Sequence, residues 1–475
     1  MNPSFTLSDF PDGLSPMVVK ELRQSLRTRT FGIVMLALHA LLTILMVMIG
    51  GSENASEVGG LLDGLVTLIL CIMLPLSGFS AVAHEIKAGT LDTLSLTGLS
   101  AIRIITGKWL SIASQCLLIA LSILPYVVAR YVFGGVDILG ELEVLYYKWL
   151  AGVTISSVII ALSTQRQFWL RALAVGLPLL MGGCGVFSWM VASRIGGGPS
   201  SYFLSFSGAT STLAITGLAA WAVFFFLTLA ATRIAPAGDA LSLIKRPVHL
   251  ALMLLLAGLA WVPSMRSGIV STASFVLGLI MMDALTERVN DVPSVYAAFY
   301  RRGWLGRLAL VFLAPGWVYG FFYTVILVVV AVCSIGVAGG REAAQMALVG
   351  ACTVWMTAVI IQLAPSLRRA HDLLTPFIVT SMFMGAMSGM FSMLLRPGLH
   401  SGATPWYACG LPSLVGLGYA SAAAADQAAF LRLGTLISLV WPFTLLILAF
   451  LKWRRGGEAR REGWILAHPK KRGAA

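Results

Sequence analysis

Long apolar runs, separated by short polar segments, make up most of the chain. A run of about 20 apolar residues lets a helix cross the hydrocarbon core of a bilayer, and a window of about 19 residues locates such runs. Twelve candidate spans result, at 31–50, 61–83, 109–133, 148–164, 172–193, 209–232, 247–262, 269–286, 308–337, 343–364, 373–395 and 431–451. The run 308–337 exceeds one span, so we expect it to tilt or to break at Pro315-Gly316. The pattern predicts an all-α polytopic membrane protein with about twelve transmembrane helices.

Composition excludes the soluble classes. Of 475 residues, 58% are hydrophobic and only 11% are charged, whereas a soluble domain carries about 25% charged residues. The same apolar content excludes intrinsic disorder. The 6 cysteines form neither a CxxC pair nor a cluster with histidine, so no metal site or disulfide framework is predicted. No arrangement of side chains suggests catalysis. We therefore predict no catalytic residues, no cofactor and no enzymatic activity in this chain.

Lysine and arginine indicate how the chain is threaded. With a cytoplasmic N-terminus, 26 of the 33 basic residues fall in inner segments, as the positive-inside rule requires. This distribution predicts cytoplasmic N- and C-termini. The net charge of +13 then reflects topology and attraction to anionic lipids of the inner leaflet. Because the cations are spread over seven inner segments, we expect no nucleic-acid partner.

Residues 1–30 are predicted to form a cytoplasmic tail that contains a short amphipathic helix. Pro16 suits the first helical position after the candidate N-cap Ser15, and apolar residues recur at positions 18, 22 and 26. The residues that define this interfacial helix are Lys20, Glu21, Leu22, Arg23 and Arg27. We expect the helix to lie among the inner headgroups, and the basic tail 452–475 to do the same.

The segment 84–108, between the second and third spans, carries the most information. Thr90 is a candidate N-cap for a short helix that Gly98 would end, and Ser100 is a candidate N-cap for the next helix. A short capped helix held between two spans would pass an applied force to both of them. The residues alone fit an ordinary capped loop equally well.

This segment resembles the cytoplasmic loop of type-2 ABC-transporter permeases. The matching residues are Glu85, Gly89, Thr90, Leu91, Leu94, Leu99, Ser100, Gly107 and Lys108. Gly98 departs from the family pattern, which has a proline before Leu-Ser. The stretch 20–23 is similar to the family's N-terminal elbow helix. The resemblance implies that residues 31–235 form a six-span permease module of an exporter in a bacterial plasma membrane. It also implies that 84–108 forms a coupling helix that docks on a separate ATPase subunit, since the chain contains no P-loop motif.

The second half, 236–451, fits a divergent six-span repeat. Residues 239–246 form a short amphipathic piece at the position that matches the elbow helix, and the inner loop 287–307 matches the coupling loop. A fused pair of halves is one hypothesis. The other is a single six-span module with a divergent appendix, for which a second permease copy is a possible partner.

Two further function classes stay open. One is a membrane scaffold or assembly protein with a permease-like fold, and the other is an ion-coupled secondary transporter. The latter would need buried charges at membrane depth. Of the polar residues in apolar runs, we expect His39 to bond a neighbouring helix, and Asp63 and Asp283 to lie at the membrane interface.

Overall fold

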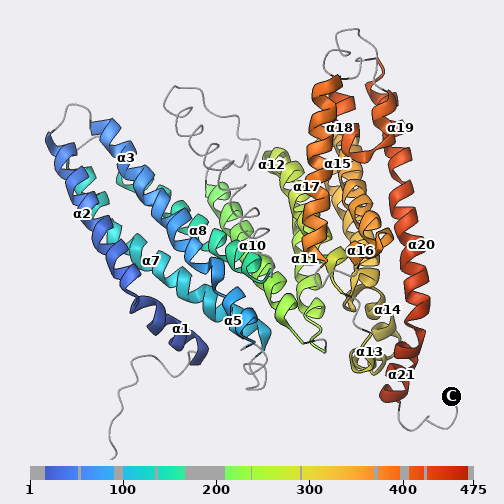
Figure 1. The fold of residues 1–475 in the computed structure, drawn as a ribbon. Helices are drawn as coiled ribbons and strands as arrows, with labels where there is room; N and C mark the ends of the chain where they lie inside the picture. The colour runs from blue at the N-terminus through green and yellow to red at the C-terminus, as the bar shows by residue number, and fades with distance from the viewer. Residues whose placement is uncertain are drawn as a thin grey trace, which may run out of the picture. The chain divides into compact units, whose positions relative to one another are not determined.

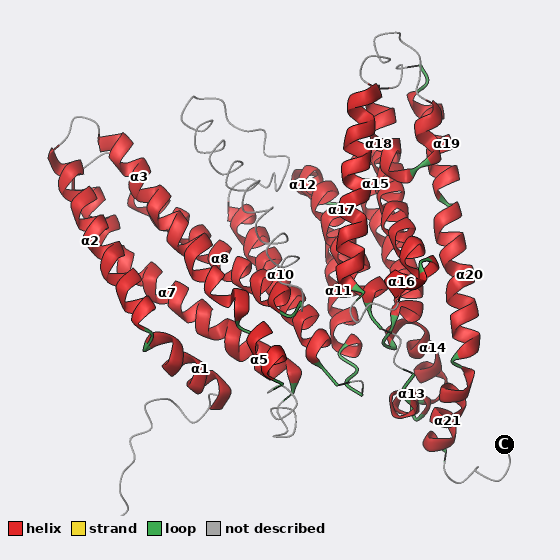
Figure 2. Ribbon diagram, viewed as in Figure 1, coloured by secondary structure: helices red, strands yellow, loops and turns green. Residues whose placement is uncertain are grey.

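The computed structural model describes residues 16–51, 55–89, 100–133, 137–165, 209–236, 238–288, 291–368, 373–395, 406–421 and 425–468. Within these ranges every regular element is a helix (Figures 1 and 2). Nine helices in the described ranges are long and apolar enough to cross a membrane. The protein is therefore an all-α polytopic membrane protein. The predicted span 172–193 lies outside the described residues.

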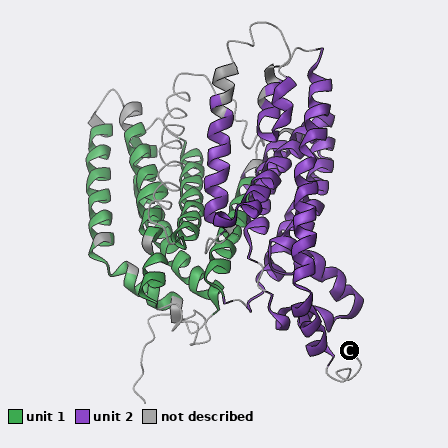
Figure 3. Cartoon of the chain, turned by 45° about the vertical axis from the view of Figure 1, so that its right-hand side comes forward, with its two compact units in different colours: residues 1–198, 213–235 green, residues 199–212, 236–475 purple. Residues whose placement is uncertain are grey.

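The chain divides into two compact units, which Figure 3 shows in green and purple. Unit 1 comprises residues 1–198 and 213–235, and unit 2 comprises residues 199–212 and 236–475. Each unit has its own core, and each is described by itself below.

Unit 1 consists of an N-terminal surface helix and a set of long apolar helices. The elements are α1 (Pro16–Leu26), α2 (Arg29–Gly51), α3 (Ala55–Leu68), η1 (Ile69–Met73), α4 (Leu74–Leu76), η2 (Ser77–Ser80), α5 (Ala83–Ala88), α7 (Ala101–Phe133), α8 (Ile138–Ser163) and α10 (Ala209–Ile234). The run from α3 to α5 is one apolar span with altered winding. A π-helical turn at 69–73 precedes Pro75, whose ring and missing N–H disturb the regular helix.

Among the described residues, unit 2 contains more short helices than unit 1. Its elements are α11 (Ser242–Leu259), η3 (Pro263–Met265), α12 (Arg266–Thr286), α13 (Pro293–Tyr300), α14 (Gly303–Leu313), α15 (Trp317–Leu363), α16 (Pro365–Arg368), α17 (Leu374–Leu395), η5 (Trp406–Gly410), α18 (Pro412–Ser421), α19 (Gln427–Ser438), α20 (Val440–Arg455) and α21 (Gly457–Ala467). Helix α12 packs most extensively against α15. At this crossing a Cβ on Gly320 would overlap the Ala284 carbonyl, so glycine permits the close approach.

The long run α15 is two helices rather than one. Gly340 interrupts it with φ 82° and ψ −175°, a conformation open mainly to glycine. Trp355 Nε1 donates to Thr324 Oγ1 at 3.1 Å. Residues 31 positions apart would lie about 46 Å apart in a straight helix, so the two parts must fold back on each other. This agrees with separate predicted spans that meet near 340.

The expected interruption at Pro315-Gly316 is confirmed. Helix α14 ends at Leu313 and α15 begins at Trp317, with Gly316 at a positive φ of 113° between them. The predicted span 308–337 therefore has the wrong start, because its first residues belong to α14.

The tail also differs from prediction: α20 extends to Arg455, and α21 packs on α13. The basic tail is thus in part a folded element.

Candidate functional site

A buried cation joins three helices at one end of unit 1. Lys108 Nζ in α7 lies 2.8 Å from Glu85 Oε1 in α5 and 3.2 Å from Glu21 Oε1 in α1. The lysine side chain is 7% exposed and each glutamate side chain is 17% exposed. Ser111 Oγ also donates to the Glu21 carbonyl at 3.4 Å. We call Lys108, Glu85 and Glu21 the Lys108 cluster.

The amphipathic character of α1 positions Glu21 in this cluster. Val18 and Leu22 are 8% and 9% exposed and face the unit, while Lys20, Arg23 and Arg27 are exposed. Helix α1 is described from Pro16, the predicted first helical position. The predicted N-cap, Ser15, lies outside the described residues. The elbow residues therefore divide as expected between a buried apolar face and an exposed cationic one.

The segment 84–108 is described only at its two ends. Glu85 lies in α5, which stops at Gly89; this glycine has φ 68° and closes the helix by donating to the Ile86 carbonyl. Ser100 directly precedes α7, and Gly107 is buried within it. The other matching positions, Thr90, Leu91, Leu94 and Leu99, lie outside the described residues. The structure thus joins the two ends of the segment to each other, and to α1, through Lys108.

A second charge cluster lies toward the other end of α7. Arg130 Nη1 is 2.8 Å from Glu141 Oε2 and 3.8 Å from Asp63 Oδ1, and Lys148 Nζ is 2.8 Å from the same aspartate oxygen. Positions 108 and 130 are roughly 33 Å apart along a helix, close to the thickness of a hydrocarbon core. The residues 109–129 between them carry no charge. The spacing of the two clusters along α7 therefore matches the thickness of a hydrocarbon core, as expected if Asp63 lies at the membrane interface.

The interior of unit 1 contains a contact that the sequence predicted. His39 Nδ1 lies 3.1 Å from the Tyr126 hydroxyl, which joins α2 to α7. The same hydroxyl lies 3.2 Å from Thr43 Oγ1. The mid-span histidine is thus bonded to a neighbouring helix, as expected.

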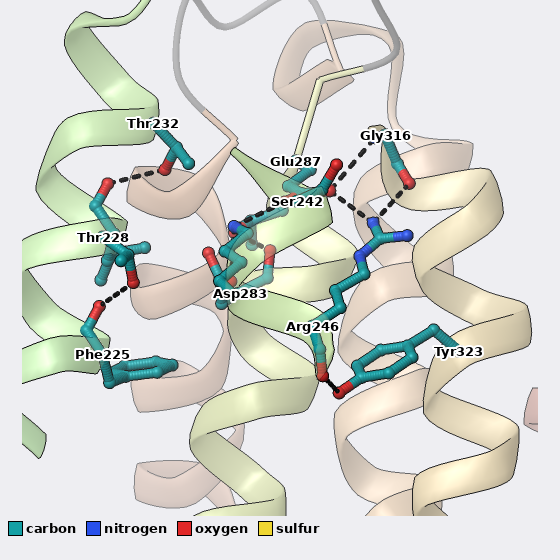
Figure 4. A network of polar contacts seen from close by, with 12 residues as sticks. Phe225, Thr228, Thr232, Ser242, Arg246, Asp283, Glu287, Gly316 and Tyr323 are labelled. Atoms are coloured by element: carbon teal, nitrogen blue, oxygen red, sulfur yellow. Dashed lines mark hydrogen bonds and ion pairs between the residues drawn. The ribbon is translucent and has the colours of Figure 1, made fainter. Parts of the chain in front are cut away.

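Unit 2 has a larger charge network, which Figure 4 shows. Lys245 Nζ lies 2.6 Å from Asp283 Oδ2 and 2.5 Å from Glu287 Oε1. Arg246 Nη2 lies 2.5 Å from Glu287 Oε2, and the Tyr323 hydroxyl donates to the Arg246 carbonyl at 2.6 Å. We call Lys245, Arg246, Asp283 and Glu287 the Arg246 network; all four residues are buried.

The Arg246 guanidinium also holds the backbone between α14 and α15. Nη1 donates to the carbonyls of Phe312 and Ala314 at 2.7 and 2.8 Å. The Gly316 N–H in turn donates to Glu287 Oε2 at 3.1 Å. Burial raises the pKa of the Glu287 carboxyl, but the charges of Arg246 and Lys245 outweigh it and lower that pKa to about 2.

This network corrects two expectations. Residues 242–246 are not a separate amphipathic piece, because they form the first turns of α11. Lys245 and Arg246 need no water there, since buried carboxylates neutralise them. Asp283 lies near the end of α12, as a residue at the interface would, but it is 2% exposed and paired with Lys245 rather than in contact with water.

The loop 287–307 of unit 2 also differs from its predicted counterpart. It folds into α13 and the start of α14, and α21 covers α13: the Cβ position of Gly463 lies 2.7 Å from Tyr296 Cβ. Tyr296 is 1% exposed, and its hydroxyl donates to Asp291 Oδ1 at 3.0 Å. In α21, Arg460 stacks 4.4 Å from the Trp453 ring centroid. A buried α13 offers little surface to a partner.

The sequence contained a signal for both networks that a linear analysis does not combine. In unit 2, Lys245 and Arg246 precede one apolar run, and two acids four positions apart, Asp283 and Glu287, lie at the end of the next run. Such acids share a helix face, and adjacent antiparallel spans bring them to the cations. In unit 1, the resemblance marks Glu21, Glu85 and Lys108 separately, and nothing in their spacing along the chain predicts that they meet.

The fold and these clusters define the class, an all-α membrane protein with charge networks at its helix ends. Comparisons with protein-family models, with curated proteins and with solved structures found no match.

Proposed function

We propose that this chain is the membrane subunit of an ATP-driven exporter of the ABC type. A separate ATPase subunit would drive it through the segment 84–108, in a bacterial plasma membrane with anionic inner lipids. The resemblance of 84–108 to the type-2 permease loop suggests the class. The Lys108 cluster is the single observation that carries the mechanism.

The Lys108 cluster gives the proposed coupling a physical route. Both ends of the segment and helix α1 share one cation that is 7% exposed. A push on the segment would displace α5 and α7 together, because Lys108 in α7 is bridged to Glu85 in α5. The α1 helix would follow through Glu21. The proposed stroke therefore moves the second and third spans as one body.

The packing of α13 in unit 2 bears on how many coupling segments one chain would have. The counterpart of the coupling helix would be α13, and α21 covers it through Tyr296 and Gly463. We therefore favour one coupling segment per chain, so that a second copy of the chain would complete the complex with an ATPase dimer.

The two alternative classes predict different observations. A secondary transporter needs ionisable groups within its transport path, whereas the Lys108 cluster and the Arg246 network lie toward the ends of spans. A scaffold would bind partners without responding to ATP. Reconstitution separates the three, since only the proposed function couples substrate to ATP turnover.

The decisive experiment is co-purification with an ATPase, followed by turnover measurements in proteoliposomes. Leu91→Asp and Leu94→Asp should each abolish the association, because a charge would enter the proposed docking face. Leu139→Asp is the matched control: Leu139 is 72% exposed at the start of α8, toward the opposite end of unit 1.

Three results would refute the assignment. Association that survives both substitutions in 84–108 would exclude that segment as the docking site. Equal loss with Leu139→Asp would show a general effect of an added charge. Turnover that never responds to the membrane subunit would favour a scaffold.

A further inference from the structure

Helix α14 presents an apolar face away from the protein. Its exposed side chains are Trp304, Leu305 and Leu308, at 69%, 60% and 53% exposure. At about 100° per residue, these three fall within one arc of the helix. On the opposite side Leu310 is buried, and Gly306 lies against the Phe299 carbonyl. One face of α14 is therefore packed and the other is bare.

The helix is too short to cross a membrane. Its 11 residues span about 16 Å, roughly half of a hydrocarbon core. Positive φ angles at Gly303 and Gly316, 70° and 113°, redirect the chain before and after it. Helix α14 is therefore not continuous with a spanning helix. An apolar helix of this length fits a position in the plane of a membrane surface.

The Arg246 network holds α14 at the level where a span begins. Arg246 and Ser242 lie in the first turns of α11, and they donate to carbonyls at the end of α14: Ser242 Oγ reaches Leu313 O at 2.9 Å, and Arg246 reaches Phe312 O. The start of a membrane-spanning helix lies at the membrane boundary. The end of α14 is thereby fixed at that boundary as well.

Cations surround the bare face. Arg301, Arg302 and Arg307 are exposed, and among the described residues none of them forms an ion pair with a carboxylate. Arginine pairs well with phosphate, and tryptophan favours the headgroup level. We propose that α14 inserts its bare face into one leaflet, while these three arginines bind anionic lipid headgroups. This inference does not depend on the transport proposal.

The test uses the full-length chain in nanodiscs, without its native cysteines. A nitroxide is attached at Trp304→Cys and, in a second variant, at Leu308→Cys. Collisions with oxygen report lipid exposure, and collisions with a nickel chelate report water exposure. In discs that contain phosphatidylglycerol, both positions should favour oxygen. Glu462→Cys, exposed on α21, is the control and should favour nickel.

Neutral discs and an arginine variant test the lipid charge. With Arg301→Gln, Arg302→Gln and Arg307→Gln combined, insertion at a fixed phosphatidylglycerol content should weaken, with the equilibrium constant for insertion falling about fivefold for each arginine. Positions 304 and 308 that are as open to nickel as 462 would overturn the proposal. So would equal insertion in neutral discs, which would remove the role of anionic lipid. Protection that appears only on adding an ATPase would identify a protein-docking face and would also overturn it.

Discussion

The Lys108 cluster of unit 1 and the Arg246 network of unit 2 both join helix ends through buried charges, but they enclose those charges to different degrees. Lys108 faces two glutamates that are each 17% exposed. Lys245 and Arg246, at 0% and 1% exposure, face two acids that are also buried. The Lys108 cluster thus has three charges that are partly exposed, and the Arg246 network has four buried charges that sum to zero.

The backbone takes part to different degrees as well. Arg246 donates to the carbonyls of Phe312 and Ala314, and Glu287 accepts from the Gly316 N–H. The ion pairs of Lys108 join side chains only. Rotamer changes can therefore open the unit 1 cluster, whereas opening the unit 2 network leaves backbone groups without partners. We infer that the Arg246 network holds its helices in a fixed arrangement, and we call it the anchor of unit 2. The Lys108 cluster can open without breaking backbone contacts, and we call it the joint of unit 1.

The largest expected effect is that of Glu287→Gln. It leaves Lys245 and Arg246 with one carboxylate between them, and removing one partner of a buried ion pair costs about 3–5 kcal/mol. Chemical unfolding in detergent measures the change. Glu462→Gln, on the exposed face of α21, is the control and should change the free energy by less than about 0.5 kcal/mol. Equal effects would show that the network is no anchor.

The pH dependence of unfolding sharpens the same point. The pKa of Glu287 in the folded state, about 2, lies below its ordinary value of 4.5. The carboxylate therefore stabilises the fold fully above about pH 5 and loses that effect as the pH falls from 4.5 toward 2. The difference in unfolding free energy between the parent protein and Glu287→Gln should shrink over this window. A constant difference from neutral pH to pH 3 would mean that Glu287 does not act through its charge.

Matched glycines test whether backbone packing also distinguishes the units. A Cβ on Gly320 would overlap the Ala284 carbonyl in unit 2, and one on Gly152 would overlap the Leu70 carbonyl in unit 1. Alanine at either position should destabilise its unit by about 1–3 kcal/mol through overpacking. Gly278 and Gly217 have no neighbour within 4 Å of such a Cβ, so alanine there should be neutral or stabilising by up to about 1 kcal/mol.

Equal losses at Gly320 and Gly152 would show that the two units are packed alike, which leaves the charges as the difference between anchor and joint. A loss at only one of the two positions would instead attribute the contrast to helix packing. Thermal unfolding of the four variants by differential scanning in detergent is sufficient for this comparison, because only the order of their unfolding temperatures is needed.

The sequence predicts the spans of this fold better than its charge contacts. Apolar runs locate most long helices because burial in lipid requires a minimum length, and Pro315-Gly316 marks a break because neither residue favours a continuing helix. The prediction of a separate amphipathic piece at 239–246 was wrong because it rested on Lys245 and Arg246, and a cation normally avoids an apolar helix unless it is paired. Their partners, Asp283 and Glu287, are about 40 positions away, beyond any local pattern.

The smallest expected effect on stability is that of Lys108→Met, and it tests the joint directly. Glu21 and Glu85 are each 17% exposed and can be hydrated once the lysine is gone, so the loss should be about 1 kcal/mol, well below that of Glu287→Gln. Hydrogen exchange should nevertheless show weaker protection of α1, because the side-chain link from α7 to Glu21 is lost. Lys20→Met, on the exposed face of α1, is the control. If α1 stays equally protected, Val18 and Leu22 alone hold it and no joint exists; if the loss matches that of Glu287→Gln, unit 1 has an anchor of the same kind as unit 2.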